Sequence, residues 1–401
     1  MLGRVFKAFQ YRDFRLVWIG ACTSSIGTWM QKLAQSWLVL EISGSPFLLG
    51  LDAFLGEIPI FLFSLVGGVV ADRKDRRLLL VGSQVIQITC ALLLTTLVAF
   101  DLVRVWHILT LSFFVGLAQA FGGPAYQALI PTLVRTEDLP NAIALNSIQF
   151  NLARVIGPML GGLALTQLGA AWCFGLNSVS YIPVILMLLA VRSRFQPEAT
   201  GESILDSMRQ GIGFIRRHAG MESLILLAFL MTMLAIPMVV FLPVFARDVF
   251  RRGPSTYTLL LSLSGAGSVV GALLLAGHGN ARHKGRKTLV ILVLLGVLMA
   301  GFSMSRWLWV SCVVLFVWSA AMIAAFALIS SLVQLITSDQ MRGRVMSVYN
   351  VAFRGGMPIG SLVTGSLAPV FSAPSVLAVY GLLLVSVGLY FLLIHRKIAA
   401  L

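Results

Sequence analysis

The chain has 401 residues, of which 58% are hydrophobic and only 11% charged, and its mean hydropathy is +0.92. Soluble domains contain about 45–50% apolar and about 25% charged residues, so the composition excludes an ordinary soluble protein and indicates a polytopic membrane protein. The net charge of +15 would suggest a nucleic-acid partner in a soluble protein. We expect no such partner, because the Lys and Arg residues form no stripe on a polar scaffold and instead follow the pattern of cytoplasmic membrane loops.

The N-terminal 15 residues carry four basic residues and precede an apolar run that is too long for a signal peptide and lacks a cleavage site. We therefore expect the chain to begin in the cytoplasm and to keep its first helix. The four cysteines, at Cys22, Cys90, Cys173 and Cys312, are far apart and show neither CxxC spacing nor a disulfide framework. We expect them to be small buried side chains, and we expect no metal site and no cofactor.

Twelve apolar runs are long enough to cross a bilayer as helices, which takes about 20 residues each. In chain order the runs are 15–40, 46–71, 78–100, 105–131, 139–168, 170–191, 222–246, 255–278, 288–305, 307–336, 343–370 and 374–394. Prolines interrupt several of them, at Pro59, Pro158, Pro237, Pro243 and Pro358. The runs predict an all-α membrane protein with twelve transmembrane helices in two six-helix bundles, residues 1–191 and 222–401.

A polar stretch at 192–221 separates the two sets of six runs. Apolar residues recur within it at helical spacing, at Ile204, Leu205, Met208, Ile212 and Ile215. The spacing predicts a short amphipathic helix on the cytoplasmic face, and a flexible tether is the alternative.

The basic residues indicate which side of the membrane each loop occupies. If both termini are cytoplasmic, 22 of the 30 Lys and Arg residues fall in cytoplasmic segments, five in outer segments, and Lys32, Arg154 and Arg354 inside runs. This asymmetry supports a topology with both ends inside.

The two halves also look like copies of one another. Arg154 pairs with Arg354 and Pro158 with Pro358, each 200 residues apart, and the loops at 67–77 and 277–287 both begin with Gly and end in a basic pair. A parallel repeat of six helices is typical of one transporter architecture.

Two motifs resemble those of the major facilitator superfamily. In "GGVVADRKDRR" (67–77), the residues that fit its loop pattern G-x-x-x-D-R-x-x-R-R/K are Gly68, Asp72, Arg73, Arg76 and Arg77. "GPMLGG" (157–162) resembles the glycine–proline motif of its exporters, with Gly157, Pro158, Gly161 and Gly162. The segments 14–51 and 241–250 are similar to the bacterial branch that holds the enterobactin exporter, macrolide-efflux proteins and transmembrane secretion effectors.

The resemblance implies a gating role for the loop at 67–77. We expect Gly67 and Gly68 to allow close helix contact and Asp72 to lie against the start of the eleventh run, near 341–344. The loop arginines are then expected to pair with Glu137 or Asp138. The alternative is a plain basic loop; a phosphate-binding loop is excluded, because no G-x-x-x-x-G-K-[ST] is present.

The glycines of the second motif form a small-residue face on the fifth run. We expect this face to pack against the eighth run, which carries Gly265, Gly267 and Gly271. Generic helix packing has the same physical basis, so the exporter role rests on the resemblance.

Ionisable residues inside the runs are the candidates for transport chemistry, because a charge in the bilayer core costs roughly 2.5–3.5 kcal/mol and should face a cavity or a partner. They are Glu57, Asp52, Arg154, Arg354 and Lys32. We expect Glu57, with Asp52, to take up and release protons, and Arg154 or Arg354 to assist it or to hold an anionic substrate group. The alternatives are a fixed pair of Glu57 with an arginine, and outward snorkelling of Asp52 and Lys32.

Together with the resemblance, these features predict a secondary transporter of a bacterial inner membrane that exports hydrophobic or amphipathic small molecules in exchange for protons. We expect it to be a monomer. A lipid or lysolipid flippase and a siderophore or metabolite exporter remain alternatives. An enzyme is disfavoured, because the chain has no H-E-x-x-H and no G-x-S-x-G. All five histidines fall at the ends of runs or in loops.

Overall fold

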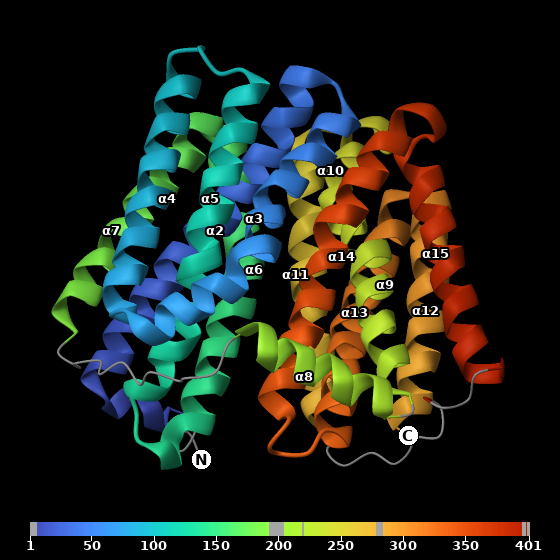
Figure 1. Ribbon diagram of the computed structural model, residues 1–401. Helices are drawn as coiled ribbons and strands as arrows, with labels where there is room; N and C mark the ends of the chain where they lie inside the picture. The colour runs from blue at the N-terminus through green and yellow to red at the C-terminus, as the bar shows by residue number, and fades with distance from the viewer. Residues whose placement is uncertain (1–5, 192–203, 219, 278–283, 395–397, 399–401) are drawn as a thin grey trace. The chain divides into compact units, whose positions relative to one another are not determined.

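The computed structural model describes residues 6–191, 204–218, 220–277, 284–394 and 398, and every regular element within these ranges is a helix (Figure 1). The first half contains α2 (Arg12–Ser43), α3 (Pro46–Arg73), α4 (Arg76–Ala99), α5 (Val105–Leu129), α6 (Leu139–Gln167) and α7 (Ala170–Ala190). The second half contains α8 (Ile204–Arg217), α9 (Met221–Val240), α11 (Pro254–Gly277), α12 (Lys284–Met304), α13 (Leu308–Ile336), α14 (Arg342–Phe371) and α15 (Ala373–Leu389). The residues 192–203, where the predicted linker begins, and most of the loop 277–287 lie outside the described ranges.

Ten helices of the described ranges are long and apolar enough to cross a membrane. The other two long helices, α2 and α14, have 32 and 30 residues, which is ample for a crossing. They are more polar than the rest because α2 contains Gln31, Lys32 and Gln35, and α14 begins with two arginines and contains Arg354. Together the twelve helices correspond to the twelve predicted runs.

Most of the prolines do not end their helices. Pro59, Pro158 and Pro358 lie inside α3, α6 and α14. The exception follows Pro237, whose carbonyl accepts the Phe241 N–H at 2.9 Å. There α9 ends at Val240, and the chain continues through α10 (Leu242–Val244) and a π-helical turn, η4 (Phe245–Val249).

The chain forms two compact units. Unit 1 comprises Met1–Ser43 and Leu55–Gly201, and unit 2 comprises Gly44–Phe54 and Glu202–Leu401. The first turns of α3 therefore belong to unit 2 and the remainder of that helix to unit 1. Each unit is described on its own below.

In unit 1, α2 packs against α6 and α7, and α4 packs against α5 and α7. Small residues allow the close approaches: a Cβ on Gly20 of α2 would lie 2.8 Å from the Val184 Cα of α7. Side chains also join these helices, because the Trp18 indole N–H of α2 donates to the Leu145 carbonyl of α6 at 2.9 Å.

Unit 2 repeats this packing scheme: α9 packs against α14 as α2 does against α6, and α12 packs against α13 and α15 as α4 does against α5 and α7. Glycines lie at the matching interface, since a Cβ on Gly356 of α14 would lie 2.5 Å from the Phe229 carbonyl oxygen of α9. The packing thus repeats between the halves in the same way as the arginine and proline positions.

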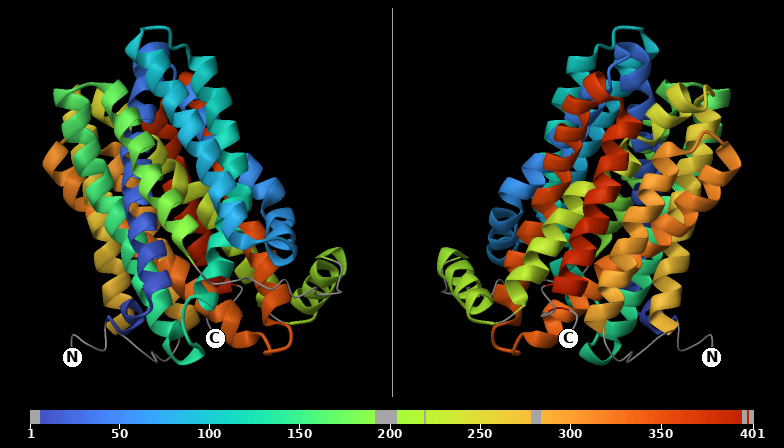
Figure 2. Two further views of the ribbon diagram at one scale, coloured as in Figure 1. Left: turned by 90° about the vertical axis from the view of Figure 1, so that its left-hand side faces the viewer. Right: turned by 90° about the vertical axis from the view of Figure 1, so that its right-hand side faces the viewer.

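The helix α8 runs crosswise to the long helices of unit 2, which run alongside one another (Figure 1 and Figure 2). It packs against α14 and α9, and a Cβ on Gly211 would lie 2.7 Å from the Arg344 carbonyl oxygen at the start of α14. Within the described part of the linker, the predicted amphipathic segment is therefore a helix that contacts one end of unit 2. Ile215 is buried there, and Ile212 is 39% exposed.

Candidate functional site

The interface between α2 and α6 in unit 1 positions a partly buried aromatic residue, Trp29. A Cβ on Gly157 of α6 would lie 2.5 Å from the Trp29 Cβ and 2.8 Å from the Ile26 carbonyl oxygen, and one on Gly161 would lie 2.9 Å from the Met30 Cα. The glycine face of α6 therefore packs directly on α2. Because Gly157 has no side chain, Trp29 packs directly against the backbone of α6.

Gly157 and Gly161 of α6 lie against α2, and Gly162 is buried beside Pro158. The expected contact of the fifth run with the eighth would join the two units, and it stays a prediction. On α11, Gly267 and Gly271 lie against Phe316 and Ala320 of α13. Each glycine face is thus already occupied by a helix of its own unit.

Two cations share the Trp29 ring. The Lys32 Nζ and the Arg154 Cζ each lie 5.4 Å from the ring centroid. The Phe150 ring meets the same indole edge-on, with centroids 6.5 Å apart. We call these four residues the Trp29 cluster: α2 supplies Trp29 and Lys32, and α6 supplies Phe150 and Arg154.

Lys32 is exposed and Arg154 is partly buried, and cation–π contacts contribute only part of what two charges in membrane helices require. Each is worth about 0.5–2 kcal/mol, whereas an arginine at the centre of a membrane helix costs roughly 2.5–3.5 kcal/mol. The two cations cannot lie farther apart than twice 5.4 Å, where like charges repel by roughly 1.5 kcal/mol at an effective dielectric constant of about 20. Among the described residues, no carboxylate lies within 4.0 Å of Lys32 or Arg154. The site therefore carries excess positive charge.

The remaining ionisable candidates occupy different environments. Asp52 is buried, with 7% of its surface exposed, and lies in the part of α3 that belongs to unit 2. Glu57 lies in the unit 1 part of α3, and its Oε2 is almost fully shielded from solvent. Arg354, the counterpart of Arg154, is exposed. Arg154 contacts the Trp29 ring, and the alternative of a fixed pair between Glu57 and an arginine stays a prediction.

The loop at 67–77 is fixed largely by backbone carbonyls. The Arg76 guanidinium donates to the carbonyls of Ala71 at 3.1 Å and Ala128 at 2.8 Å, and Arg77 donates to that of Val191 at 2.8 Å. These bonds join the α3–α4 loop to the ends of α5 and α7. Arg76 also forms an ion pair with Asp72 at 3.5 Å.

The acidic residues of this loop have separate roles. Asp75, which the sequence motif does not include, caps α4 by accepting the Arg77 N–H at 2.8 Å and the Leu78 N–H at 3.4 Å. Asp72 lies one turn before Arg76 and pairs with it. The contact of Asp72 with the start of the eleventh run would join the two units, and it stays a prediction.

The two glycines of the loop motif differ. A Cβ on Gly67 would collide with the Ala120 backbone of α5, whereas one on Gly68 would meet no described atom within 4 Å. Close helix contact within unit 1 thus depends on Gly67. Arg73 is exposed.

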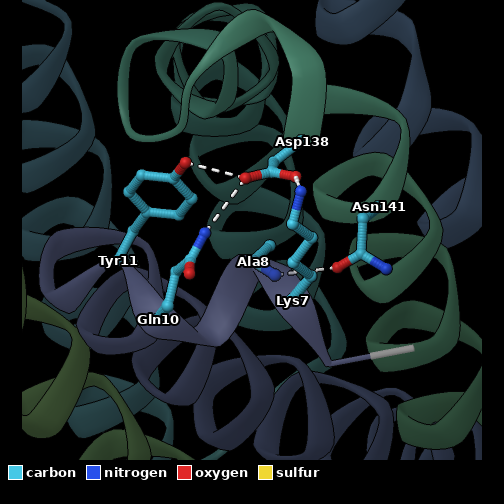
Figure 3. Close-up of polar contacts among 6 residues, drawn as sticks. All are labelled: Lys7, Ala8, Gln10, Tyr11, Asp138 and Asn141. Carbon is cyan, nitrogen blue, oxygen red and sulfur yellow. Dashed lines mark hydrogen bonds and ion pairs between the residues drawn. The ribbon is translucent and has the colours of Figure 1, made fainter. Parts of the chain in front are cut away.

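Asp138 accepts hydrogen bonds from the N-terminal segment rather than from the loop arginines (Figure 3). Its carboxylate contacts the Lys7 Nζ at 2.6 Å, the Tyr11 hydroxyl at 2.8 Å and the Gln10 amide at 3.0 Å. The expectation that Glu137 or Asp138 would pair with the arginines of 67–77 was wrong, because among the described residues Asp138 is bonded to this segment and Glu137 forms no ion pair. The physical reason is proximity: the short helix η1 (Lys7–Gln10) lies directly beside Asp138.

These hydrogen bonds shift both charged groups toward their ionised forms. The Lys7 hydrogen bond, with that of Tyr11, holds the pKa of Asp138 below its ordinary value, and Asp138 raises the pKa of Lys7. The Ala8 N–H also donates to the Asn141 side chain at 2.9 Å. The N-terminal segment is therefore fastened to the start of α6, the helix that carries Arg154.

A network of neutral polar side chains, which was not predicted from the sequence, crosses the interior of unit 1. Asn177 of α7 donates to Gln31 of α2 at 2.6 Å, the Tyr181 hydroxyl donates to Gln87 of α4 at 3.3 Å, and Gln119 of α5 donates to Gln87 at 3.1 Å. A second branch runs from Gln35 of α2 to Ser112 of α5 at 2.8 Å. Glutamine and asparagine within apolar runs were the available signal, because such residues in membrane helices seek partners on neighbouring helices.

Unit 2 contains a hollow of about 500 Å³ on α13 and the start of α14. The residues that line it are Ala327, Ser330, Ser331, Gln334, Leu335 and Arg342. Arg342 is held by Asp339 at 2.6 Å. Among the described residues, no group of three His, Cys, Asp or Glu side chains could hold a metal ion.

Twelve long apolar helices, packed alike in two halves and carrying charges in their interiors, define a multi-pass membrane transporter of the major facilitator type. The chain belongs to the transmembrane secretion effector family, whose model matches residues 4–399. It is a transporter and not an enzyme.

Curated relatives agree with this assignment. The enterobactin exporter EntS of Shigella boydii is 27% identical over 96% of this chain and 92% of its own length. Macrolide efflux protein A of Streptococcus pyogenes is 23% identical over 74% of each chain. Among solved structures, the nucleoside transporter NupG superposes with a TM-score of 0.68 at 13% identity, covering 95% of this chain and 97% of its own; this similarity shows the fold alone.

Proposed function

We propose that this protein exports amphipathic or hydrophobic small molecules by alternating access and is driven by proton entry. The observation that carries the export proposal is the full-length similarity to an exporter, together with a charged and aromatic cluster at the α2–α6 interface of unit 1. The proposal includes a bacterial inner-membrane location with both termini cytoplasmic. Within unit 1, the basic loop 73–77 and the α7 end share one end of the bundle, as such a topology requires.

Proton coupling is proposed for Glu57, with Asp52 as a second carboxylate. Both lie in α3, and both are shielded: Asp52 is 7% exposed, and the Glu57 Oε2 is almost fully enclosed. A shielded carboxylate in a membrane helix is a candidate proton carrier, because ionisable residues within membrane spans mark ion and proton pathways.

The test is substrate efflux from proteoliposomes with an imposed pH gradient. Glu57→Gln should abolish the acceleration that the gradient produces while leaving downhill efflux in place. Asp101→Asn is the matched control, because Asp101 is an exposed loop residue with φ of 55°, a conformation that asparagine adopts readily. Gradient-driven efflux that is undiminished in Glu57→Gln would remove this residue from the coupling mechanism.

The gating role of the loop at 67–77 is part of the same proposal. Asp72 is expected to meet the start of α14 when the cytoplasmic side is closed, with Gly67, Arg76 and Arg77 holding the loop against α5 and α7. We expect Asp72→Asn to slow efflux several-fold without reducing the amount of folded protein. An unchanged efflux rate would contradict the gating role and support the alternative of a plain basic loop that only sets the membrane topology.

A lipid or lysolipid flippase and a siderophore or metabolite exporter are the competing functions. They are separated from drug export by a susceptibility panel in a pump-deficient bacterial host. Reduced susceptibility to several amphipathic compounds supports drug export. Unchanged susceptibility to every compound would favour a lipid or metabolite as the substrate.

A further inference from the structure

The Trp29 cluster gathers positive charge at the α2–α6 interface of unit 1, where Arg154 is partly buried and Lys32 is exposed. Lys32 and Arg154 come from different helices and meet at one indole, and neither has a carboxylate partner among the described residues. Packing alone does not require this arrangement, since the adjoining α2–α6 contact is made by Gly157 and Gly161. An unbalanced pair of cations in a membrane helix bundle is a binding determinant for a negative group.

The depth of the cluster indicates which negative group it meets. Arg154 lies near the middle of α6 (Leu139–Gln167), about 20 Å from either end at 1.5 Å per residue. Lipid phosphates lie outside a hydrocarbon core that is about 30 Å thick, so a headgroup at its normal depth does not reach the site. A dissolved ion or molecule that enters the bundle does.

The rest of the cluster indicates the body of that molecule. Trp29 offers an aromatic surface, and Phe150 is 51% exposed beside it. The Arg154 guanidinium can donate two parallel hydrogen bonds to a carboxylate or sulfonate, and Lys32 adds a flexible point charge. Aromatic rings and an acidic group are therefore recognised at one place.

We propose that the Trp29 cluster binds the acidic group of the substrate and that the transported class is amphipathic organic anions with an aromatic or aliphatic body. This inference rests on the proposed export function for the statement that the bound molecule is transported. It narrows that function, because neutral and cationic amphiphiles would lack the group that Lys32 and Arg154 recognise.

The experiment compares two probes that differ by one anionic group. 1-Anilinonaphthalene-8-sulfonate and N-phenyl-1-naphthylamine share a ring system, and only the first carries a sulfonate. Equilibrium binding of both to the purified protein is measured for the wild type and for Arg154→Gln, Lys32→Gln and Arg154→Lys. The matched control is Arg306→Gln, an exposed arginine of the α12–α13 connection in unit 2.

Arg154→Gln should weaken sulfonate binding at least tenfold and change binding of the neutral probe less than twofold. Arg154→Lys should restore part of the lost affinity, Lys32→Gln should weaken the sulfonate severalfold, and Arg306→Gln should change neither probe. Equal weakening of both probes, or no change for either, would overturn the inference. Size-exclusion and thermal-unfolding profiles identify variants that misfold. If Arg154→Gln misfolds, Arg154→Lys and Lys32→Gln still test whether the two cations bind the sulfonate.

Transport separates the two proposals. If the wild type moves the neutral probe as fast as the sulfonate, export stands and the anion assignment fails. If sulfonate binding depends on Arg154 but the wild type moves neither probe, the site assignment stands and the export proposal fails.

Discussion

Asp138 receives three hydrogen bonds from the chain's N-terminal segment, and its carboxylate side chain is only 5% exposed. Single charges in unit 1 are generally placed by such local partners: Asp75 caps a helix, Arg77 reaches a helix-end carbonyl, and Arg154 lies over an indole. Each of these contacts depends on one charged side chain, so a single substitution of that side chain removes the contact.

The Asp138 contact should make stability depend on pH in a defined window. Its folded pKa is lowered from an unfolded value of about 3.9, so its contribution is present above about pH 4 and is lost as the pH falls through the folded pKa. Lys7 has a raised pKa, so its contribution is lost only as the pH rises through that value, above about 10.

We therefore expect Asp138→Asn to lower the melting temperature by roughly 2–4 °C near pH 7, measured by scanning fluorimetry in detergent. The difference from the wild type should persist down to about pH 5 and narrow below about pH 4. Asp101→Asn serves as the control. A difference of the same size at pH 3 and pH 7 would show that the carboxylate charge is not what matters.

At the scale of elements, glycines decide which helix faces meet. Gly157 and Gly161 of α6 fit against α2, and Gly356 and Gly360 of α14 fit against α9. The same device thus serves the equivalent helix pair of each unit, which is the structural counterpart of the 200-residue sequence repeat.

Gly157→Ala should destabilise the protein by roughly 1–3 kcal/mol, because the added methyl group meets Trp29 and the Ile26 backbone. Gly82→Ala in α4 is the matched control, since no described atom lies within 4 Å of its added Cβ and alanine favours a helix interior by up to about 1 kcal/mol. Chemical denaturation of both variants measures the contrast. Equal stability changes would contradict the close packing of α6 on α2.

Helix existence could be predicted from the sequence, and helix pairing could not. The apolar runs indicated α2 to α7, α9 and α11 to α15 because hydropathy is a local property, and the linker spacing indicated α8. The face of α6 that carries Gly157 and Gly161 was visible too, but the sequence did not indicate that α2 packs on it. Small residues permit close packing with any suitable helix, so they do not name their neighbour.

At the scale of the whole molecule, unit 1 is held together by polar contacts as well as by apolar packing. The network through Gln31, Asn177, Tyr181, Gln87 and Gln119 connects α2, α7, α4 and α5. In a bilayer, where lipid is as apolar as the helix faces, such bonds add specificity to the association of helices.

Asn177→Leu should weaken unit 1 by about 0.6–1.7 kcal/mol, the range measured for hydrogen bonds between membrane helices. Gln31→Leu alone should have a similar effect, and the double variant should cost less than the sum, because both changes remove the same 2.6 Å bond. The free energies of unfolding of the wild type, the two single variants and the double variant are measured in mixed detergent as a double-mutant cycle. Strictly additive costs would show that the bond contributes nothing.

The sequence by itself determined that this is a helical membrane protein with twelve crossings, a repeated half and charges inside its helices. Those properties depend on composition, run length and spacing, which act along the chain. Only the tertiary structure decided that Arg154 and Lys32 meet at Trp29, that Asp138 is bonded to the N-terminal segment, and that neutral amides link four helices. These contacts join residues as far apart as 146 positions, and which distant side chains meet is fixed by how the helices pack, not by local pattern.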